Sequence, residues 1–441
     1  MKALAALVLA APLFADVPRM GPPAELPVWV DPGDVPVPTW ARSVVPSRAE
    51  SAFYAEPGKI ELRRGSAQPG ARLPLFATRR GPGCSGRWLN VGPLAWMCSD
   101  VGDFSADEPG TPALGTRPWI AEGEDLARPH RPGARALPPI EPVSASDDGL
   151  PYRYYFAGRD GAYGFQNLQT ALDDSPEQDL EPGFAVALLE EATAHGQKWG
   201  RTKKGRWVAM RELSPARPNL FHGELLKEET NVGWVVNDKV SAFTSEKLDK
   251  ASGLRVRFEK VVIEEEKGSA LRVGDGVWLR AKDVARVRLV APPPEVTGED
   301  ERWIDVDLAQ QTLIAYVGKT PVFATIVSTG KGPAPDFVTH PGTFRIWVKI
   351  FTTKMDNLDK EEADRHYAIE DVPWVQFFDK AIALHGAFWH REFGHLHSHG
   401  CVNLAPLDAR WLFAFTSPHL PQGWSAVLPT KIEQGAVVRV R

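Results

Sequence analysis

Residues 384–404 read LHGAFWHREFGHLHSHGCVNL, and this stretch decides the fold and the chemistry expected of the C-terminal part of the chain. His385 stands near its start, and Cys401, far from any other cysteine, stands near its end. A thiol and an imidazole are the two parts of a cysteine nucleophile and its base. They can meet only if the chain between them doubles back, which Gly394 and Gly400 make feasible. Gly400 also lets backbone N–H groups turn towards a developing oxyanion.

The same stretch resembles the YkuD-type L,D-transpeptidase catalytic domain. The signature of that family is a His, a spacer, and then Ser/Thr-His-Gly-Cys followed by a hydrophobic residue and Asn or Arg. Residues 385–403 supply these elements in that order. Three upstream segments look like the early strands and turn of the domain, namely residues 303–306, 327–330 and 341–346. The resemblance covers about residues 301–441 and implies a β-rich catalytic domain there.

The resemblance assigns roles residue by residue. It implies that Cys401 forms a thioester with the substrate, that His385 is its base, and that the carbonyl of Gly386 orients the imidazole. The loop and the oxyanion pocket would be shaped by Ser398, His399 and Gly400. The substrate-binding residues that it implies are Tyr367, Trp389 and Asn403.

The resemblance also implies a reaction. Members of the family take an acyl group from a peptidoglycan tetrapeptide stem, cleaving the bond between the L-centre of a diamino acid and the terminal D-Ala. They pass the acyl group to an amine of a neighbouring stem. They need no metal or organic cofactor, and carbapenems typically acylate their thiol. Peptidoglycan stem peptides are therefore the expected partners, and carbapenem-type compounds are the expected inhibitors.

Three other interpretations remain open at this stage. Water could replace the amine acceptor, which would make the protein an L,D-carboxypeptidase or endopeptidase. The protein could be a catalytically inactive wall-binding protein, against which the intact motif argues. Zinc could be held by the cluster of His385, His390, His395, His397, His399 and Cys401. No metal site is predicted, because the standard Cys/His spacings are missing and a coordinated thiolate would no longer act as a nucleophile.

The two remaining cysteines suggest a disulfide. Cys84 and Cys98 lie close together in the sequence. In an oxidising compartment, a bridge closing a loop of about 15 residues stabilises a small domain by roughly 3 kcal/mol in the chain-entropy model. We predict a structural disulfide between them, with two buried thiols as the alternative.

The start of the chain and its charge indicate where the protein works. The apolar run of residues 4–15 behind Lys2 is typical of a secretion signal, so residues 1–15 are predicted to be a signal peptide. No later stretch approaches the ~20 apolar residues of a membrane span, so an integral membrane protein is not expected. With 51 basic and 56 acidic residues, the net charge is -5, and nucleic acid is not an expected partner. The expected location is the periplasm or the cell wall.

Proline-rich stretches divide the chain. The 39 Pro and 38 Gly favour turn-rich, mainly β structure with extended linkers. Turn glycines precede Trp88, Trp207 and Trp278, a weak repeat that indicates small β-barrels loosely similar to bacterial SH3-type domains. The predicted division is a Pro-rich linker at 16–50, an SH3-like domain at 51–106, a second linker at 107–148, an SH3-like domain at 149–220, a β-rich and optionally SH3-like domain at 221–298, and the catalytic domain at 301–441.

Two elements can be predicted in more detail. Residues 184–195 are rich in Ala, Leu and Glu, but their β context predicts a strand. After the motif, apolar residues recur at helical spacing and predict a helix packed on the core, with Pro406 near its first turn. These residues are Leu404, Leu407, Trp411, Leu412 and Phe415.

Overall fold

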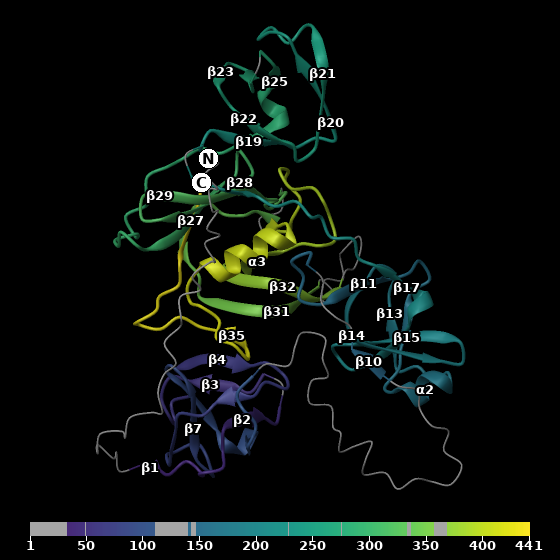
Figure 1. Cartoon of the computed structure of the whole chain (residues 1–441), viewed down its shortest axis with the longest axis vertical. Helices are drawn as coiled ribbons and strands as arrows, with labels where there is room; N and C mark the ends of the chain where they lie inside the picture. Colours follow the sequence, from purple (N-terminus) through teal and green to yellow (C-terminus); the bar gives the residue numbers. More distant parts are fainter. Residues whose placement is uncertain are drawn as a thin grey trace, which may run out of the picture.

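The computed structural model of the chain describes residues 33–48, 50–110, 140–142, 147–227, 229–274, 276–332, 337–356 and 368–441. Strands dominate these residues, which confirms the mainly β fold class. Three small β modules surround a C-terminal region that holds the longest helix drawn in Figure 1. The predicted signal peptide, about half of the linker predicted at 16–50 and most of the one predicted at 107–148 lie outside the described residues. The described part of the first linker carries two strands that pair within the N-terminal module. Within those residues, every helix is too short or too polar to span a bilayer.

The N-terminal module occupies residues 33–110. Its strands are β1 (Asp34–Val35), β2 (Ser43–Pro46), β3 (Ala52–Tyr54), β4 (Arg63–Ala67), β5 (Leu73–Pro74), β6 (Ala77–Arg79), β7 (Trp88–Gly92), β8 (Ala95–Cys98) and β9 (Gly102–Ser105). The predicted turn-adjacent Trp88 is buried and its indole N–H donates to Pro82 O at 3.0 Å. The Trp88 indole is therefore part of the core of this module.

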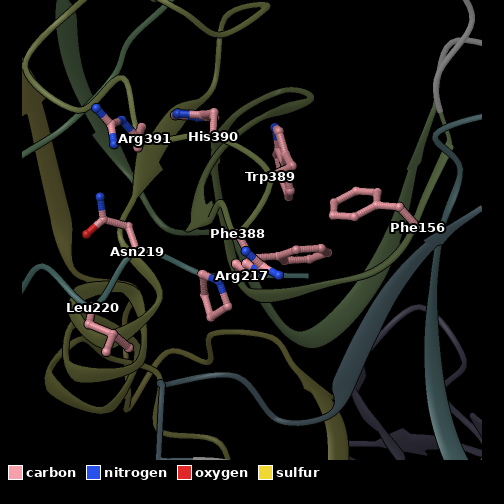
Figure 2. Close-up of a pocket in the computed structure, with 9 residues that line it drawn as sticks. Phe156, Arg217, Asn219, Leu220, Phe388, Trp389, His390 and Arg391 are labelled. Carbon is pink, nitrogen blue, oxygen red and sulfur yellow. The ribbon is translucent and has the colours of Figure 1, made fainter. Parts of the chain in front are cut away.

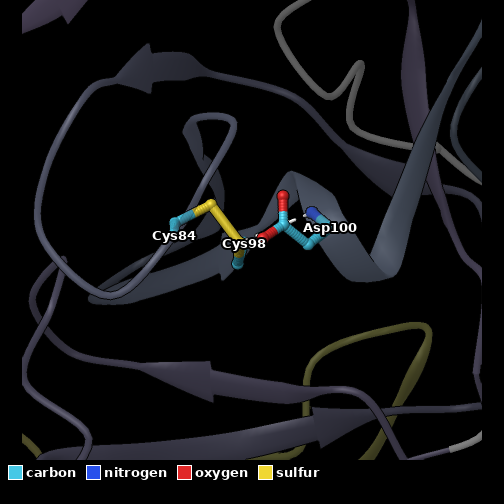
Figure 3. Close-up of side chains that lie close together, drawn as sticks. All are labelled: Cys84, Cys98 and Asp100. Carbon is cyan, nitrogen blue, oxygen red and sulfur yellow. Dashed lines mark hydrogen bonds between the residues drawn. A yellow bond between two sulfur atoms is a disulfide. The ribbon is translucent and has the colours of Figure 1, made fainter.

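A disulfide joins Cys84 to Cys98 in this module (Figure 3). Asp100 lies beside it and accepts hydrogen bonds from the backbone N–H groups of Ser85 and Gly86. These donors favour the charged carboxylate and lower the pKa of Asp100. Two cysteines and an acid at this spacing look like a metal site, but both sulfur atoms are already bonded to each other.

The middle module occupies residues 147–217. Its elements are β11 (Arg153–Ala157), β12 (Ala162–Gly164), α2 (Leu168–Leu172), β13 (Gln178–Leu180), β14 (Ala185–Ala194), β15 (Gln197–Thr202), β16 (Trp207–Ala209) and β17 (Leu213–Pro215), and β10 (Ile140–Pro142) pairs with β14. The predicted strand at 184–195 is confirmed as β14, because pairing on both edges overrides its helical composition.

The third module occupies residues 232–286. Its strands are β19 (Val232–Val235), β20 (Lys239–Phe243), β21 (Ala251–Val256), β22 (Lys260–Val262), β23 (Glu265–Lys267), β24 (Ala270–Arg272), β25 (Trp278–Arg280) and β26 (Val284–Arg286). The short strand before it, β18 (Glu224–Leu225), pairs with a strand of the C-terminal region. The domain boundary predicted at 221 therefore falls in a segment that packs on the C-terminal region. The SH3-like character of all three modules stays a prediction.

The C-terminal region, residues 301–441, contains two sheets with a helix between them. Its elements are β27 (Arg302–Asp307), β28 (Thr312–Val317), β29 (Thr320–Ile326), β30 (Gly342–Arg345), β31 (Val348–Asp356), β32 (Ala368–Asp379), β33 (Ile382–Gly386), β34 (Val402–Leu404), α3 (Pro406–Phe415), β35 (Trp424–Val427) and β36 (Val437–Val440). One sheet has the order β18-β29-β28-β27-β36-β30, and the other contains β31 to β35. The predicted helix is confirmed as α3, with Pro406 in its first turn.

Helix α3 is held from both sheets (Figure 1). Trp411 stacks on Phe323 of β29, with ring centroids 4.1 Å apart. At the other end, the buried Lys349 of β31 donates to the carbonyls of Phe413 and Thr416, which close the last turn of the helix. Burial lowers the pKa of Lys349 to about 7. The helix is thus a fixed platform behind β33 and β34, which carry the predicted site.

Hydrogen-bonded strands join the modules to the C-terminal region. β35 pairs with β4, and Trp424 packs in the core of the N-terminal module, 4.5 Å from the ring of Phe53. A Cβ at Gly65 would lie 2.3 Å from Ala426 O, so only glycine permits this approach of the two strands. On another side, Ala185 of β14 pairs in parallel with Ile369 of β32.

Candidate active site

The strands β33 and β34 bring His385 and Cys401 to one face of the sheet. They run in parallel, with Leu384 opposite Val402 and His385 opposite Asn403. Side chains alternate along strands, so Cys401, directly before Val402, shares the face of His385 and Asn403. The packing agrees, because Leu384 and Val402 belong to one core and Cys401 packs on another. The doubling back expected between the two residues is therefore present.

The His385 imidazole is buried, with 3% of its surface exposed, and is held in one tautomer. Its Nδ1 lies 3.2 Å from the carbonyl oxygen of Gly386. A carbonyl only accepts, so Nδ1 carries the proton and Nε2 keeps its lone pair. Burial lowers the pKa of His385 to about 4, which leaves the ring neutral at pH 7. The ring can therefore accept a proton at Nε2.

Cys401 is partly exposed and packs against an apolar cluster that contains Phe388, and its Sγ lies 4.0 Å from Ala381 O. These surroundings disfavour the thiolate and raise the pKa of Cys401 to about 11. With the pKa of His385 lowered as well, both shifts favour an uncharged thiol and an uncharged imidazole over an ion pair. A thiolate then forms only when a base removes the proton.

We expect alkylation of Cys401 by iodoacetamide to follow this pKa. Because only the thiolate reacts, the rate constant should rise about tenfold per pH unit between roughly pH 7 and pH 10. Mass spectrometry of the unreduced protein checks this, with Cys401→Ala as the unlabelled control. A rate that is already constant around neutral pH would contradict the prediction and indicate a preformed thiolate–imidazolium pair.

The loop before Cys401 is braced by its own side chains and by two distant segments. Ser398 Oγ donates to Cys401 O at 2.5 Å and accepts from Gly400 N–H at 3.2 Å. Thr339 Oγ1 donates to Gly400 O at 2.7 Å. Gly400 has a φ of 112° and its Cα lies 3.0 Å from where a Cβ on Gly330 would be, so both positions favour glycine. Ser398 and Gly400 therefore shape the loop, but the Gly400 N–H is directed at Ser398.

The remaining predicted residues occupy different surroundings. His399 is exposed, and its ring lies 4.6 Å from that of Phe337. Trp389 stacks on His385, with centroids 5.7 Å apart and planes at 26°. Asn403 is buried and its side-chain amide lies 2.9 Å from His390 Nε2. Tyr367 lies outside the described residues.

His390 is a site residue that the sequence reasoning missed, since it appeared there only among the ligands of the zinc alternative. Its Nδ1 accepts from Glu392 N–H at 3.1 Å, and its Nε2 faces Asn403. Burial lowers its pKa to about 3, with His397 and His385 adding to the shift. In the sequence it is one of five crowded histidines, at positions 385, 390, 395, 397 and 399, and nothing local separates it from the others. Its hydrogen bonds and those of His395, whose Nε2 faces Val236 O, hold the loop and do not converge on a common point.

Residues of the middle module also pack against the strands and the loop next to the site, and no motif pointed to them. Tyr154 lies 4.2 Å from the ring of Phe388, and its hydroxyl donates to Asp371 O at 2.6 Å. Trp374 Nε1 donates to Gly149 O at 2.7 Å. Asp371 and Trp374 both have positive φ, so the middle module holds the two strained residues of β32.

The third module holds the loop after β33. The Arg257 guanidinium donates to Arg391 O at 2.9 Å and pairs with the Glu392 carboxylate at 3.2 Å. Asp238 is ion-paired with both Arg257 and Arg391. The loop that carries Trp389 and His390 is therefore fixed between two modules that lie outside the sequence motif.

Comparison with known proteins gives a family match for the C-terminal region. Residues 301–438 match the YkuD family, described as the L,D-transpeptidase catalytic domain. The C-terminal region is a YkuD-type catalytic domain. The match contains β27 to β35 and the first half of β36, and with them both His385 and Cys401. It leaves the three modules unassigned. A search of curated proteins found no match.

Solved L,D-transpeptidases were found as well. One from Stackebrandtia nassauensis is 26% identical over 34% of this chain and 60% of its own, with a TM-score of 0.23. One from Enterococcus faecium is 22% identical over 32% of this chain and 50% of its own, with a TM-score of 0.24. L,D-transpeptidase 3 from Mycobacterium tuberculosis, in complex with a faropenem-derived adduct, is 17% identical over 32% of this chain and 60% of its own, with a TM-score of 0.25. The chain thus spans about half to three fifths of these proteins, and the assignment of the YkuD-type domain rests on the family match.

Proposed function

We propose that this protein is a peptidoglycan L,D-transpeptidase that uses Cys401 as its nucleophile and His385 as its base. The observation that carries the proposal is the parallel β33–β34 pair, which puts a thiol and a neutral imidazole on one face of the YkuD-type domain. An imidazole whose Nδ1 is committed to the Gly386 carbonyl has its other nitrogen free to take the thiol proton.

In the acylation step, His385 Nε2 accepts the proton of Cys401 as Sγ attacks the carbonyl carbon of the donor stem. The peptide bond to the terminal D-Ala breaks, and the imidazolium gives its proton to the departing amine. The product is a thioester and free D-Ala. The developing oxyanion needs backbone donors, and the N–H of Cys401 is our candidate, since the N–H of Gly400 is directed at Ser398.

In the second step, an amine of a neighbouring stem attacks the thioester carbon and the C–S bond breaks. His385 takes the proton of that amine and returns it to the thiolate of Cys401. The Cys84–Cys98 disulfide supports the export that this substrate requires, since disulfides persist in oxidising compartments. We therefore place the enzyme in the periplasm or cell wall.

Incubation of the purified protein with a stem tetrapeptide tests the proposal. A cross-linked dimer with released D-Ala is the expected product, and an acyl adduct of one stem should be found on Cys401 by mass spectrometry. Tripeptide without dimer would instead identify a hydrolase that uses the same thioester. Absence of both products, together with no adduct from a carbapenem, would overturn the enzymatic assignment.

A further inference from the structure

A pocket of about 530 Å³ lies beside the candidate active site, between the middle module and the loop after β33. Its walls come from Phe156 at the end of β11, from residues 217–220 that lead out of the middle module, and from residues 388–391. Figure 2 shows Trp389, Phe388 and Phe156 bordering it, and Arg217 also lines it. Its volume is within the range of about 300–1,000 Å³ that is usual for sites of small ligands.

Trp389 connects this pocket to His385. The indole lines the pocket and also stacks on the His385 imidazole. Phe388, another wall residue, packs in the cluster that Cys401 contacts, and its ring lies 6.0 Å from that of Phe156. A ligand in the pocket is therefore next to the imidazole, across one aromatic side chain.

The charged residues that line the pocket indicate which kind of ligand it can bind. Its lining includes the guanidinium groups of Arg217 and Arg391 and contains no carboxylate. Arg391 is ion-paired with Asp238, whereas Arg217 makes no ion pair or hydrogen bond with the residues that the structure describes. Arginine binds carboxylates with its planar fork of donors, and the aromatic walls suit an aliphatic chain. The complementary ligand is a short peptide with a free carboxylate and an aliphatic side chain.

We propose that this pocket binds the acceptor stem, with its terminal carboxylate at Arg217 and its amine directed past Trp389 to the thioester. This rests on the proposed function. The acceptor amine must lose its proton to His385 when it attacks, so the acceptor belongs on the side of the imidazole. The amine nitrogen bonds to the thioester carbon, the C–S bond breaks, and the proton passes through His385 to the Cys401 thiolate.

Isothermal titration calorimetry of the Cys401→Ala protein tests binding without chemistry. The probes are a stem tetrapeptide with a free C-terminal carboxylate and the same peptide as its C-terminal amide, in buffer of low ionic strength. The acid should bind about three- to fivefold more tightly than the amide, as is typical of an exposed charge pair. Adding the Arg217→Ala substitution to the Cys401→Ala protein should reduce the ratio of the acid affinity to the amide affinity to near one.

Two more variants sharpen the test. Leu220 is 67% exposed, so Leu220→Glu adds a carboxylate to the pocket without touching a core, and it should weaken binding of the acid but not of the amide. Arg211→Ala is the control, because Arg211 is an exposed arginine of the same module outside the pocket. It should leave the acid-to-amide ratio as it is.

The acceptor role has its own readout in the active enzyme. Arg217→Ala should lower the ratio of cross-linked dimer to hydrolysed tripeptide, because water then competes better for the thioester. The proposal would be overturned if the ratio of acid affinity to amide affinity were the same with and without Arg217. It would also be overturned if the ratio of dimer to tripeptide did not change when Arg217 is replaced. A protein whose Cys401 is never acylated would overturn the proposed function instead, while the calorimetric ratios would still report on the pocket.

Discussion

Replacing His385 by glutamine should slow acylation of Cys401 by a stem tetrapeptide about 10²- to 10⁴-fold, the usual contribution of a positioned general base. The size of the effect follows from the resting state of the pair. The pKa of Cys401 is raised to about 11, so at neutral pH very few molecules carry the thiolate without a base. Glutamine retains an amide that can contact Gly386, but it cannot accept the thiol proton.

Single-turnover mass spectrometry of the acyl adduct measures this rate, and Cys401→Ala should give no adduct at all. The exposed His340, which faces Asp379, supplies the control variant His340→Gln, with an expected change of less than twofold. The rate of the His385→Gln protein should recover as the pH rises towards 11, because hydroxide then supplies the thiolate. A His385→Gln protein as fast as the wild type at pH 7 would remove His385 from the mechanism.

Replacing Asp408 by alanine should destabilise the protein by about 3–5 kcal/mol, as expected when one partner of a buried polar cluster is removed. Asp408 lies on α3 with none of its surface exposed. Its carboxylate faces His222 Nδ1 at 2.6 Å, accepts the Gly223 N–H at 2.9 Å, and accepts the Thr325 hydroxyl. Alanine would leave these donors without an acceptor and would release the segment before β18 from the YkuD-type domain.

The destabilisation should depend on pH. The Asp408 carboxylate raises the pKa of His222 above its ordinary value of 6.5. The ion pair therefore contributes fully below pH 6.5 as long as Asp408, whose pKa burial raises above its ordinary value of 3.8, stays ionised. Its contribution is lost as the pH rises through the raised pKa of His222. The difference in unfolding free energy between wild type and Asp408→Ala should be larger near pH 6 than near pH 8.

Urea unfolding at the two pH values measures this difference. The exposed Asp300 supplies the control, and Asp300→Ala should change the free energy of unfolding by less than about 0.5 kcal/mol. Equal stability of the Asp408→Ala and wild-type proteins would show that the cluster does not hold the segment in place. Limited proteolysis between residues 219 and 230 gives a second readout of its release.

The residues of the candidate site could be predicted where the information is local. Cys401 and His385 stand in a short motif, and α3 has its own helical spacing and N-terminal proline. Strand β14 is a partial exception, because its composition favours a helix. Pairing with β11 and β15 decides in favour of a strand.

The rest depends on contacts between residues far apart in the sequence. His222 meets Asp408 across 186 positions, and Trp374 meets Gly149 across 225. The burial of His390 similarly follows from the folded loop and from Asn403. No local pattern encodes such pairings, because each partner alone looks like an ordinary polar residue.

The sequence by itself determined which atoms can react and which elements carry them: a thiol, an imidazole, two glycine-bearing turns and the helix that follows. Only the tertiary structure decided the protonation of that pair, because desolvation sets both pKa values and depends on what surrounds the side chains. It also decided that the middle module lines the pocket beside the site and that the third module holds the loop after β33, through side chains whose partners lie in other modules.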